Sequence, residues 1–293
     1  MPLYFTVVLI WSFVYRGYGR YFLLSSMFGA NLSHLFGIHV PHGPRVLWSL
    51  AVEEHFYLLW PAIVFLLDHR KILFLCAAIL IGSPILRGVY AAQGMNPEVI
   101  YDLSWFRFDG LATGAAMAIW VRSECFERTT AHRIVAGLLC ALPLMSLVGA
   151  RFGLFGTKTV VAVALRYTQA YLAFGASFIL VLVYRGMRWT AFLRNRFMQL
   201  SGALSYCLYL IHLSLGDAYR FLISHQHLVH FNPTAAVFVR CGSMLIVSFG
   251  FAMLSHKYLE EPFLALKEKF SSRVSTRQNE TARAASPAVE ASG

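Results

Sequence analysis

Two carboxylates and a histidine lie inside a stretch that otherwise has the composition of a membrane-spanning helix. Glu53, Glu54 and His55 follow Val52 directly and precede the apolar run that ends at Trp60. A charged group at the centre of a membrane helix costs about 2.5–3.5 kcal/mol, so such groups mostly face a protein interior or a wet cavity and mark a function. A carboxylate held there can take a proton from a hydroxyl group. The stretch is therefore the first candidate for a catalytic site.

A helix over this stretch places its polar residues on one side, because residues three and four apart are neighbours on a helix surface. That side can line a cavity while Leu50, Leu58 and Leu59 face lipid or other helices. Glu53 is predicted to be catalytic. The side chains predicted to contact a substrate on or beside the same face are Trp48, Ser49 and Tyr57.

The order of residues 48–61, W-S-L-x-x-E-E-x-F-Y-L-L-W-P, resembles the signature of acyltransferase family 3, integral membrane enzymes that O-acylate sugars and other hydroxyl compounds. Residues 105–114, 200–212 and 256–263 resemble three further blocks of the same family, in the same order. The resemblance implies an acyl-CoA donor on the cytoplasmic side and transfer to a carbohydrate or glycolipid. It also implies that this chain lacks the first helices of the family, which carry the histidine regarded as catalytic there.

The second block contains Arg107 and Asp109, both predicted to bind substrate. Residues two apart cannot share a helix face, so each needs its own partner, and Glu53 is a candidate partner for Arg107. The alternative is that Arg107 extends to the membrane interface. Gly110 and Gly114 form a small-xxx-small pair, which predicts the close approach of another helix.

The third block places polar residues along one side of an apolar helix: Ser201, Ser205, Tyr209, His212 and Gly216. His212 is predicted to be the second catalytic residue, and Ser205 and Tyr206 are predicted to contact substrate. The alternative is that His212 is a hydrogen-bonded packing residue. For the fourth block, which ends at Phe263, we favour structural anchoring over contact with a cytoplasmic donor.

Composition indicates an all-α, polytopic transmembrane bundle. Of the 293 residues, 58% are hydrophobic and only 13% are charged, about half the usual charged share of a soluble domain. The net charge of +11 comes from basic residues in short loops, which the positive-inside rule explains better than nucleic-acid binding. We expect a bacterial inner-membrane protein with a cytoplasmic C-terminus and about eight spans, at 2–15, 47–67, 72–90, 103–121, 134–150, 159–184, 199–222 and 234–259.

Residues 1–265 are predicted to form one transmembrane domain, and residues 266–293, rich in Ser, Thr, Ala and charge, a disordered cytoplasmic tail. The loop at 16–46 carries His34, His39 and His42 without a standard metal-ligand spacing, so they are expected to be surface histidines. The five cysteines likewise show no zinc spacing. We predict no metal and no cofactor besides acyl-CoA as co-substrate.

Together these residues predict a water-accessible cavity in the outer half of the membrane, around Glu53, Arg107 and His212. A base, a cationic donor and restricted access of water are what acyl transfer to a hydroxyl needs. Two alternatives stay open. Buried charges also mark the ion pathways of transporters, although no inverted repeat is visible. The second alternative is that the chain is an inactive or partial remnant of the family.

Overall fold

In the computed structural model, the described residues are 2–124, 126–156, 159–222, 233–263 and 265–266, and within them every regular element is a helix. The predicted all-α class is therefore confirmed. The chain divides into two compact units, one of Met1–Phe13 with Ser201–Gly293 and the other of Val14–Leu200. The predicted tail lies, except for residue 266, outside the described residues.

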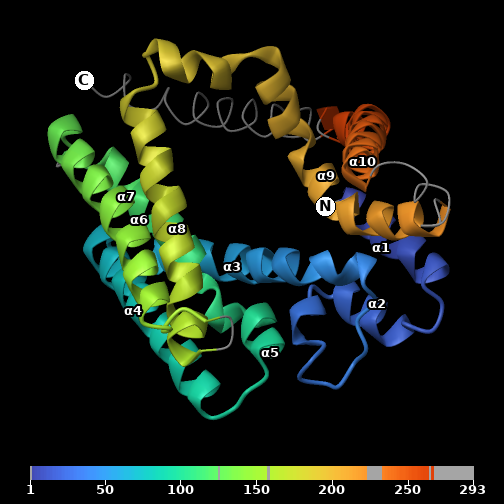
Figure 1. Cartoon of the computed structure of the whole chain (residues 1–293), viewed down its shortest axis with the longest axis horizontal. Helices are drawn as coiled ribbons and strands as arrows, with labels where there is room; N and C mark the ends of the chain where they lie inside the picture. Colours follow the sequence, from blue (N-terminus) through green and yellow to red (C-terminus); the bar gives the residue numbers. More distant parts are fainter. Residues whose placement is uncertain (1, 125, 157–158, 223–232, 264, 267–293) are drawn as a thin grey trace, which may run out of the picture. The chain divides into compact units, whose positions relative to one another are not determined.

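The unit of residues 14–200 contains the helices α2 (Gly19–Ser26), α3 (Leu47–Leu66), α4 (His69–Ala92), α5 (Pro97–Asp102), α6 (Phe108–Arg122), α7 (Arg128–Arg151) and α8 (Val160–Val183). Short 3-10 turns lie between them: η1 (Ala30–Leu32), η2 (Gly43–Val46), η3 (Ser104–Phe106) and η4 (Arg188–Arg194). Helices α4, α6, α7 and α8 lie side by side, and α3 contacts α4 and α6 (Figure 1). The other unit contains α1 (Pro2–Val14) except its last residue, α9 (Arg196–Leu222) from residue 201 on, α10 (Pro233–Ser255) and the π-helical turn η5 (His256–Glu260).

All eight ranges predicted to span the membrane are largely helical. Within the described part of the chain, five segments are long and apolar enough to cross a bilayer: Gly43–Leu66, His69–Ala92, Arg128–Arg151, Val160–Val183 and Val237–Phe263. The span predicted at 103–121 begins five residues late, because residues 104–106 form a 3-10 turn. Its helix, α6, has 15 residues and is about 22 Å long, short of a hydrocarbon core of about 30 Å.

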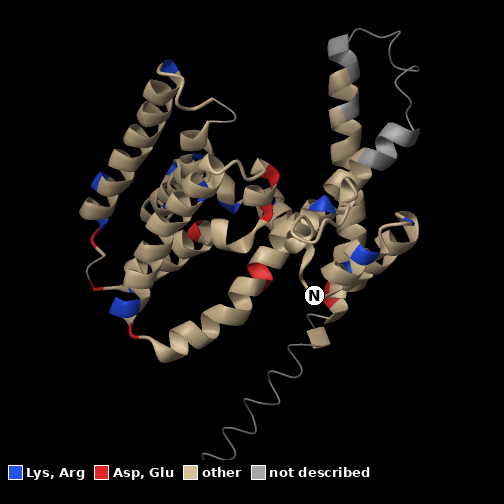
Figure 2. Ribbon diagram, turned by 90° about the horizontal axis from the view of Figure 1, so that it is seen from below, with Lys and Arg blue, Asp and Glu red and all other residues tan. Residues whose placement is uncertain are grey.

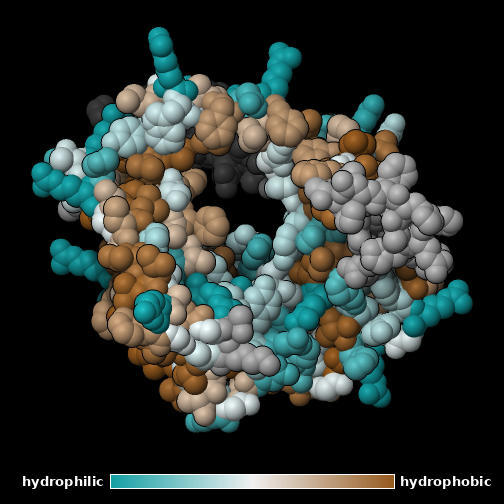
Figure 3. Space-filling view, viewed as in Figure 1, coloured by the Kyte–Doolittle hydropathy of each residue, from teal (hydrophilic) through white to brown (hydrophobic). Residues whose placement is uncertain are grey.

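The surface of the helices has the character that lipid requires. Large apolar side chains point outward along α3 and α4, with Leu58 79%, Phe65 87% and Phe74 77% exposed, and apolar areas cover much of the surface in Figure 3. Lys and Arg lie mostly at helix ends and in connections (Figure 2). Exposed apolar sides with basic ends are typical of membrane helices. The protein is therefore an integral membrane protein.

Helices α6 and α8 approach each other closely through glycines. A Cβ atom at Gly110 of α6 would lie 3.0 Å from the ring of Tyr171 on α8, and one at Gly175 of α8 would lie 2.7 Å from the sulfur of Met117. A Cβ at Gly114 would meet nothing within 4 Å. The predicted close approach at a small-xxx-small pair thus holds at Gly110 and not at Gly114.

Buried polar contacts attach residues 15–46 to the helices. The amide of Asn31 donates to Ser104 Oγ at 2.8 Å, and Ser104 Oγ lies 2.8 Å from His55 Nδ1. His34 Nε2 lies 3.1 Å from Asp102 Oδ2, and the His34 side chain is 25% exposed. His34 was expected to be a surface histidine, but it packs against a carboxylate 68 residues away in sequence, which no local spacing reveals. His55 also takes part in these contacts, through Ser104.

Candidate functional site

A cavity of about 240 Å³ lies where α3, the start of α6 and α8 meet. Helix α3 contributes one face, α6 contributes its first turn and the residue before it, and α8 contributes one aromatic ring. The lining residues are Trp48, Ser49, Val52, Glu53, Arg107, Gly110, Leu111 and Tyr171. Four of the nine residues predicted for the site, Trp48, Ser49, Glu53 and Arg107, therefore meet at one cavity.

Arg107 precedes the first residue of α6 and is enclosed by aromatic rings from three other segments. Its guanidinium carbon lies 4.2 Å from the ring centre of Tyr167, 4.7 Å from that of Tyr101 and 5.1 Å from that of Trp48, with the ring of Tyr171 at 5.6 Å. Cation–π contacts hold the charge without using its N–H donors. Arg107 Nη1 is buried and has no hydrogen-bond partner, so the hydrogen-bonding capacity of this nitrogen is unused.

Glu53 is half-buried on the face of α3 that borders the same cavity. Glu53 and Arg107, both in the described part of the chain, do not form the ion pair that sequence suggested. The aromatic rings around Arg107 explain this, because they balance its charge in place of a carboxylate. A carboxylate and a guanidinium that share a cavity without neutralising each other leave both groups for a substrate.

The lower part of the predicted α3 face does not reach the cavity. Tyr57 is 56% exposed, and it is not among the residues that line the cavity. Phe56 turns inward instead and stacks on Trp60, with ring centres 4.6 Å apart. Residues 56 and 57 differ by about 100° around the helix, and here Phe56, not Tyr57, is the one that points inward. The predicted contact between Tyr57 and substrate gains no support from this geometry.

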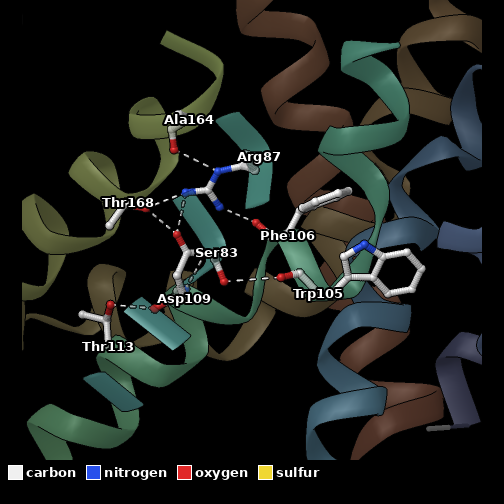
Figure 4. A network of polar contacts seen from close by, with 9 residues as sticks. Ser83, Arg87, Trp105, Phe106, Asp109, Thr113, Ala164 and Thr168 are labelled. Carbon is white, nitrogen blue, oxygen red and sulfur yellow. Dashed lines mark hydrogen bonds and ion pairs between the residues drawn. The ribbon is translucent and has the colours of Figure 1, made fainter. Parts of the chain in front are cut away.

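Asp109 lies outside the cavity lining, in a buried ion pair with Arg87 of α4 (Figure 4). Arg87 Nη2 donates to Asp109 Oδ2 at 2.9 Å, and the Thr168 hydroxyl of α8 donates to the same oxygen at 2.6 Å. Both charged side chains are completely buried. Asp109 therefore joins three helices, and its predicted contact with substrate stays a prediction without geometric support.

Sequence reasoning missed Arg87, although a signal for it exists. It is the one charged residue between Leu73 and Asn96, inside an apolar run where an unpaired arginine would be costly. Arg87 also donates to the backbone carbonyls of Phe106 and Ala164, and Ser83 donates to the carbonyl of Trp105 at 3.3 Å. The bonds to Trp105 and Phe106 fix the backbone just before Arg107, and the pair with Asp109 anchors the side chain two residues after it. Arg87 therefore acts on the cavity by positioning.

The residues predicted for the site from the third block, His212, Ser205 and Tyr206, lie in the other unit, on α9. His212 is exposed, and its Nδ1 lies 2.6 Å from the carbonyl oxygen of Tyr209 one turn earlier. Ser205 is exposed and donates to the carbonyl of Gly202 at 2.7 Å, and Tyr206 is half-buried. The contribution of His212, Ser205 and Tyr206 to the cavity beside Glu53 stays a prediction.

Comparison with known proteins shows a partial similarity to one enzyme. The chain is 35% identical over 99 residues, 31% of its length, to the peptidoglycan O-acetyltransferase OatA of Listeria monocytogenes. The match covers 15% of the length of that protein. No protein-family model matches the chain, and no solved structure matches it. The sequence is thus related, over about a third of its length, to a protein that O-acetylates peptidoglycan.

Proposed function

We propose that this chain forms the catalytic membrane part of an acyltransferase of the family 3 type. The proposed reaction moves an acyl group from acyl-CoA to a hydroxyl of a carbohydrate or glycolipid, and acetyl is the acyl group to test first. The observation that carries the proposal is the cavity that Glu53 and Arg107 both line, with Arg107 Nη1 buried and without a hydrogen-bond partner. The partial similarity to a peptidoglycan O-acetyltransferase supports the same reaction class.

Glu53 takes the role of general base. As the acceptor hydroxyl attacks the thioester carbonyl, its proton passes to the carboxylate, and the new C–O bond forms while the carbonyl π electrons move to oxygen. Collapse of the tetrahedral intermediate breaks the C–S bond, and the departing thiolate recovers the proton from the Glu53 carboxylic acid.

Arg107 takes the role of oxyanion donor. Its Nη1 is already desolvated and unpaired, and the rings around the guanidinium hold it in place before a substrate arrives. A fixed donor in a site of low polarity stabilises developing negative charge with little reorganisation. The positive charge is therefore most useful when the carbonyl oxygen becomes an oxyanion.

The size of the cavity matches a small reacting group. At about 240 Å³ it is below the range of about 300–1,000 Å³ that is usual for sites enclosing a whole drug-sized molecule. It accommodates the acyl end of the donor and the acceptor hydroxyl, with the rest of both substrates outside. His212, Ser205 and Tyr206 stay predictions from the sequence, and the proposed step uses none of them.

The test is transfer of labelled acetyl from acetyl-CoA to a peptidoglycan or polysaccharide acceptor, in membranes that contain this chain or a form extended at its N-terminus. We expect Glu53→Gln to abolish transfer, because the amide cannot take the hydroxyl proton. Glu54→Gln is the matched control, since Glu54 is adjacent and does not line the cavity. Equal loss in both variants, or full activity of Glu53→Gln, would refute the assignment, as would the absence of transfer by correctly inserted protein of either length.

A further inference from the structure

A second and larger cavity, of about 520 Å³, lies between the first turns of α7 and the end of α8. Both helices are among the segments able to cross a membrane, so the cavity lies where two such segments end. Its lining contains basic, hydroxyl and apolar groups and no carboxylate: Arg128, Thr129, His132, Arg133, Val183, Tyr184, Gly186 and Met187. The proposed acyl transfer makes no use of it.

The polar part of the lining consists of groups that donate hydrogen bonds. Arg128 and Arg133 bring two permanent positive charges, and each guanidinium can donate several N–H bonds to an oxyanion. The hydroxyl of Tyr184 lies 2.8 Å from His132 Nδ1, and a neutral imidazole that accepts this bond carries its proton on Nε2. With the hydroxyl of Thr129, the wall presents four donor side chains and suits a phosphate group.

The rest of the surroundings are apolar and exposed. The turn after α8 exposes Met187 by 51%, Trp189 by 47% and Phe192 by 56%. The turn is held in shape by the buried hydroxyl of Thr190, which donates to the carbonyls of Met187 at 2.8 Å and Tyr184 at 3.0 Å. Tryptophan and arginine together at the end of a membrane helix are typical of the lipid headgroup region. Apolar side chains beside a phosphate-type wall therefore match a lipid rather than a soluble anion.

We propose that this cavity binds the headgroup phosphate of an anionic phospholipid, with Arg128 and Arg133 on the phosphate and with Met187, Trp189 and Phe192 against the upper acyl chains. The site holds one lipid at the junction of α7 and α8. It differs from general attraction of basic loops to an anionic membrane, because the two arginines belong to one cavity.

The experiment measures lipid adducts of the purified full chain by native mass spectrometry, with phosphatidylglycerol and phosphatidylcholine as probes. We expect one molecule of phosphatidylglycerol to bind to the chain, more tightly than phosphatidylcholine does. The double variant Arg128→Gln with Arg133→Gln should weaken the binding of phosphatidylglycerol about thirty-fold, since each basic side chain near an anionic headgroup contributes roughly five-fold. The matched control is Arg122→Gln with Arg196→Gln, two exposed arginines that do not line the cavity. Thermal unfolding and size-exclusion profiles verify the fold, and the single variants Arg128→Gln and Arg133→Gln replace the double variant if it is unstable.

An equal loss of binding in the cavity pair and the control pair would overturn the proposal in favour of general electrostatic attraction. Unchanged binding in the cavity pair would overturn it outright. Inorganic pyrophosphate serves as the soluble probe. If pyrophosphate displaces phosphatidylglycerol at comparable concentration, the cavity is a site for a soluble phosphate and the assignment to lipid is refuted.

Discussion

Arg87 donates from Nη2 to Asp109 Oδ2 at 2.9 Å, and neither side chain is exposed at all. The pair joins α4 to the first turn of α6, and Thr168 ties both residues to α8. Because Arg107 lies only two residues before Asp109, the ion pair supports the backbone that carries the cavity arginine. The buried charges also form hydrogen bonds with a hydroxyl and with backbone carbonyls. A buried ion pair is tolerated when such additional hydrogen bonds satisfy its remaining donors and acceptors.

Removal of Arg87 is expected to destabilise the protein strongly. Arg87→Met leaves the Asp109 carboxylate buried without its cation, and breaking a buried pair from one side costs about 3–5 kcal/mol. Unfolding in detergent, followed by thermal scanning, measures the change. Arg122→Met, in which an exposed arginine is lost, should be close to neutral. Arg87→Met combined with Asp109→Asn should recover part of the loss, and strict additivity of the two changes would contradict the pairing.

Arg107 is expected to control the rate rather than the fold. Arg107→Met keeps the apolar contacts with Tyr101 and Tyr167 but removes the charge and the free donor, and loss of an oxyanion donor typically lowers kcat about 10²–10³-fold. The acetyl-transfer assay measures this effect, with KM determined alongside. Arg45→Gln serves as the control, because Arg45 forms an exposed ion pair with Glu98 at 3.6 Å, and such pairs contribute little. A raised KM at unchanged kcat would assign Arg107 to binding alone.

Gly110 and Gly114 provide a matched pair of substitutions on α6. A Cβ at residue 110 would lie 3.0 Å from the Tyr171 ring, which borders the cavity, so Gly110→Ala should move that ring and cost about 1–3 kcal/mol of stability. Gly114→Ala meets open space and should be neutral or stabilise the helix by up to about 1 kcal/mol. Thermal unfolding and acetyl transfer distinguish the two. Similar behaviour of both variants would show that α6 and α8 do not touch at Gly110.

Stability is expected to depend on the protonation of Asp102, which lies in α5 outside the spanning segments. Burial raises the pKa of Asp102 from 3.8 to about 6, although the charges of Arg45, His34 and Arg107 act in the opposite direction and Glu98 adds to the rise. A raised pKa in the folded state means that the folded protein binds the proton more tightly than the unfolded chain. The contribution of protonated Asp102 to the stability of the fold is therefore complete below about pH 3.8 and is lost as pH rises through about 6.

The measurement is the pH dependence of thermal unfolding for the natural protein and for Asp102→Asn. The difference between the two should change between pH 4 and pH 7, by an amount on the order of 3 kcal/mol if the full pKa change is expressed. Asp68→Asn is the control, because Asp68 is an exposed carboxylate that does not contribute to the Asp102 shift. A difference between the natural protein and Asp102→Asn that does not vary with pH would mean that Asp102 titrates normally.

The helices, and half of the eight residues that line the cavity beside Glu53, were predictable because the relevant information is local. Apolar runs of sufficient length identify helices, and the spacing of Trp48, Ser49 and Glu53 places them on one side of α3 whatever packs there. The 3-10 turn before α6 was missed, since a single turn changes the hydrophobic pattern too little to be seen.

What the amino-acid sequence determined by itself is the helical class, the positions of the helices and the presence of polar groups too costly to leave in lipid. The tertiary structure decided their partners: Asp109 pairs with Arg87, and Arg107 is held by aromatic rings rather than by Glu53. The physical reason is that helical periodicity states which side of a helix is polar, whereas the choice of partner depends on how helices pack. That packing rests on contacts such as Gly110 against Tyr171, between residues 61 positions apart in the chain.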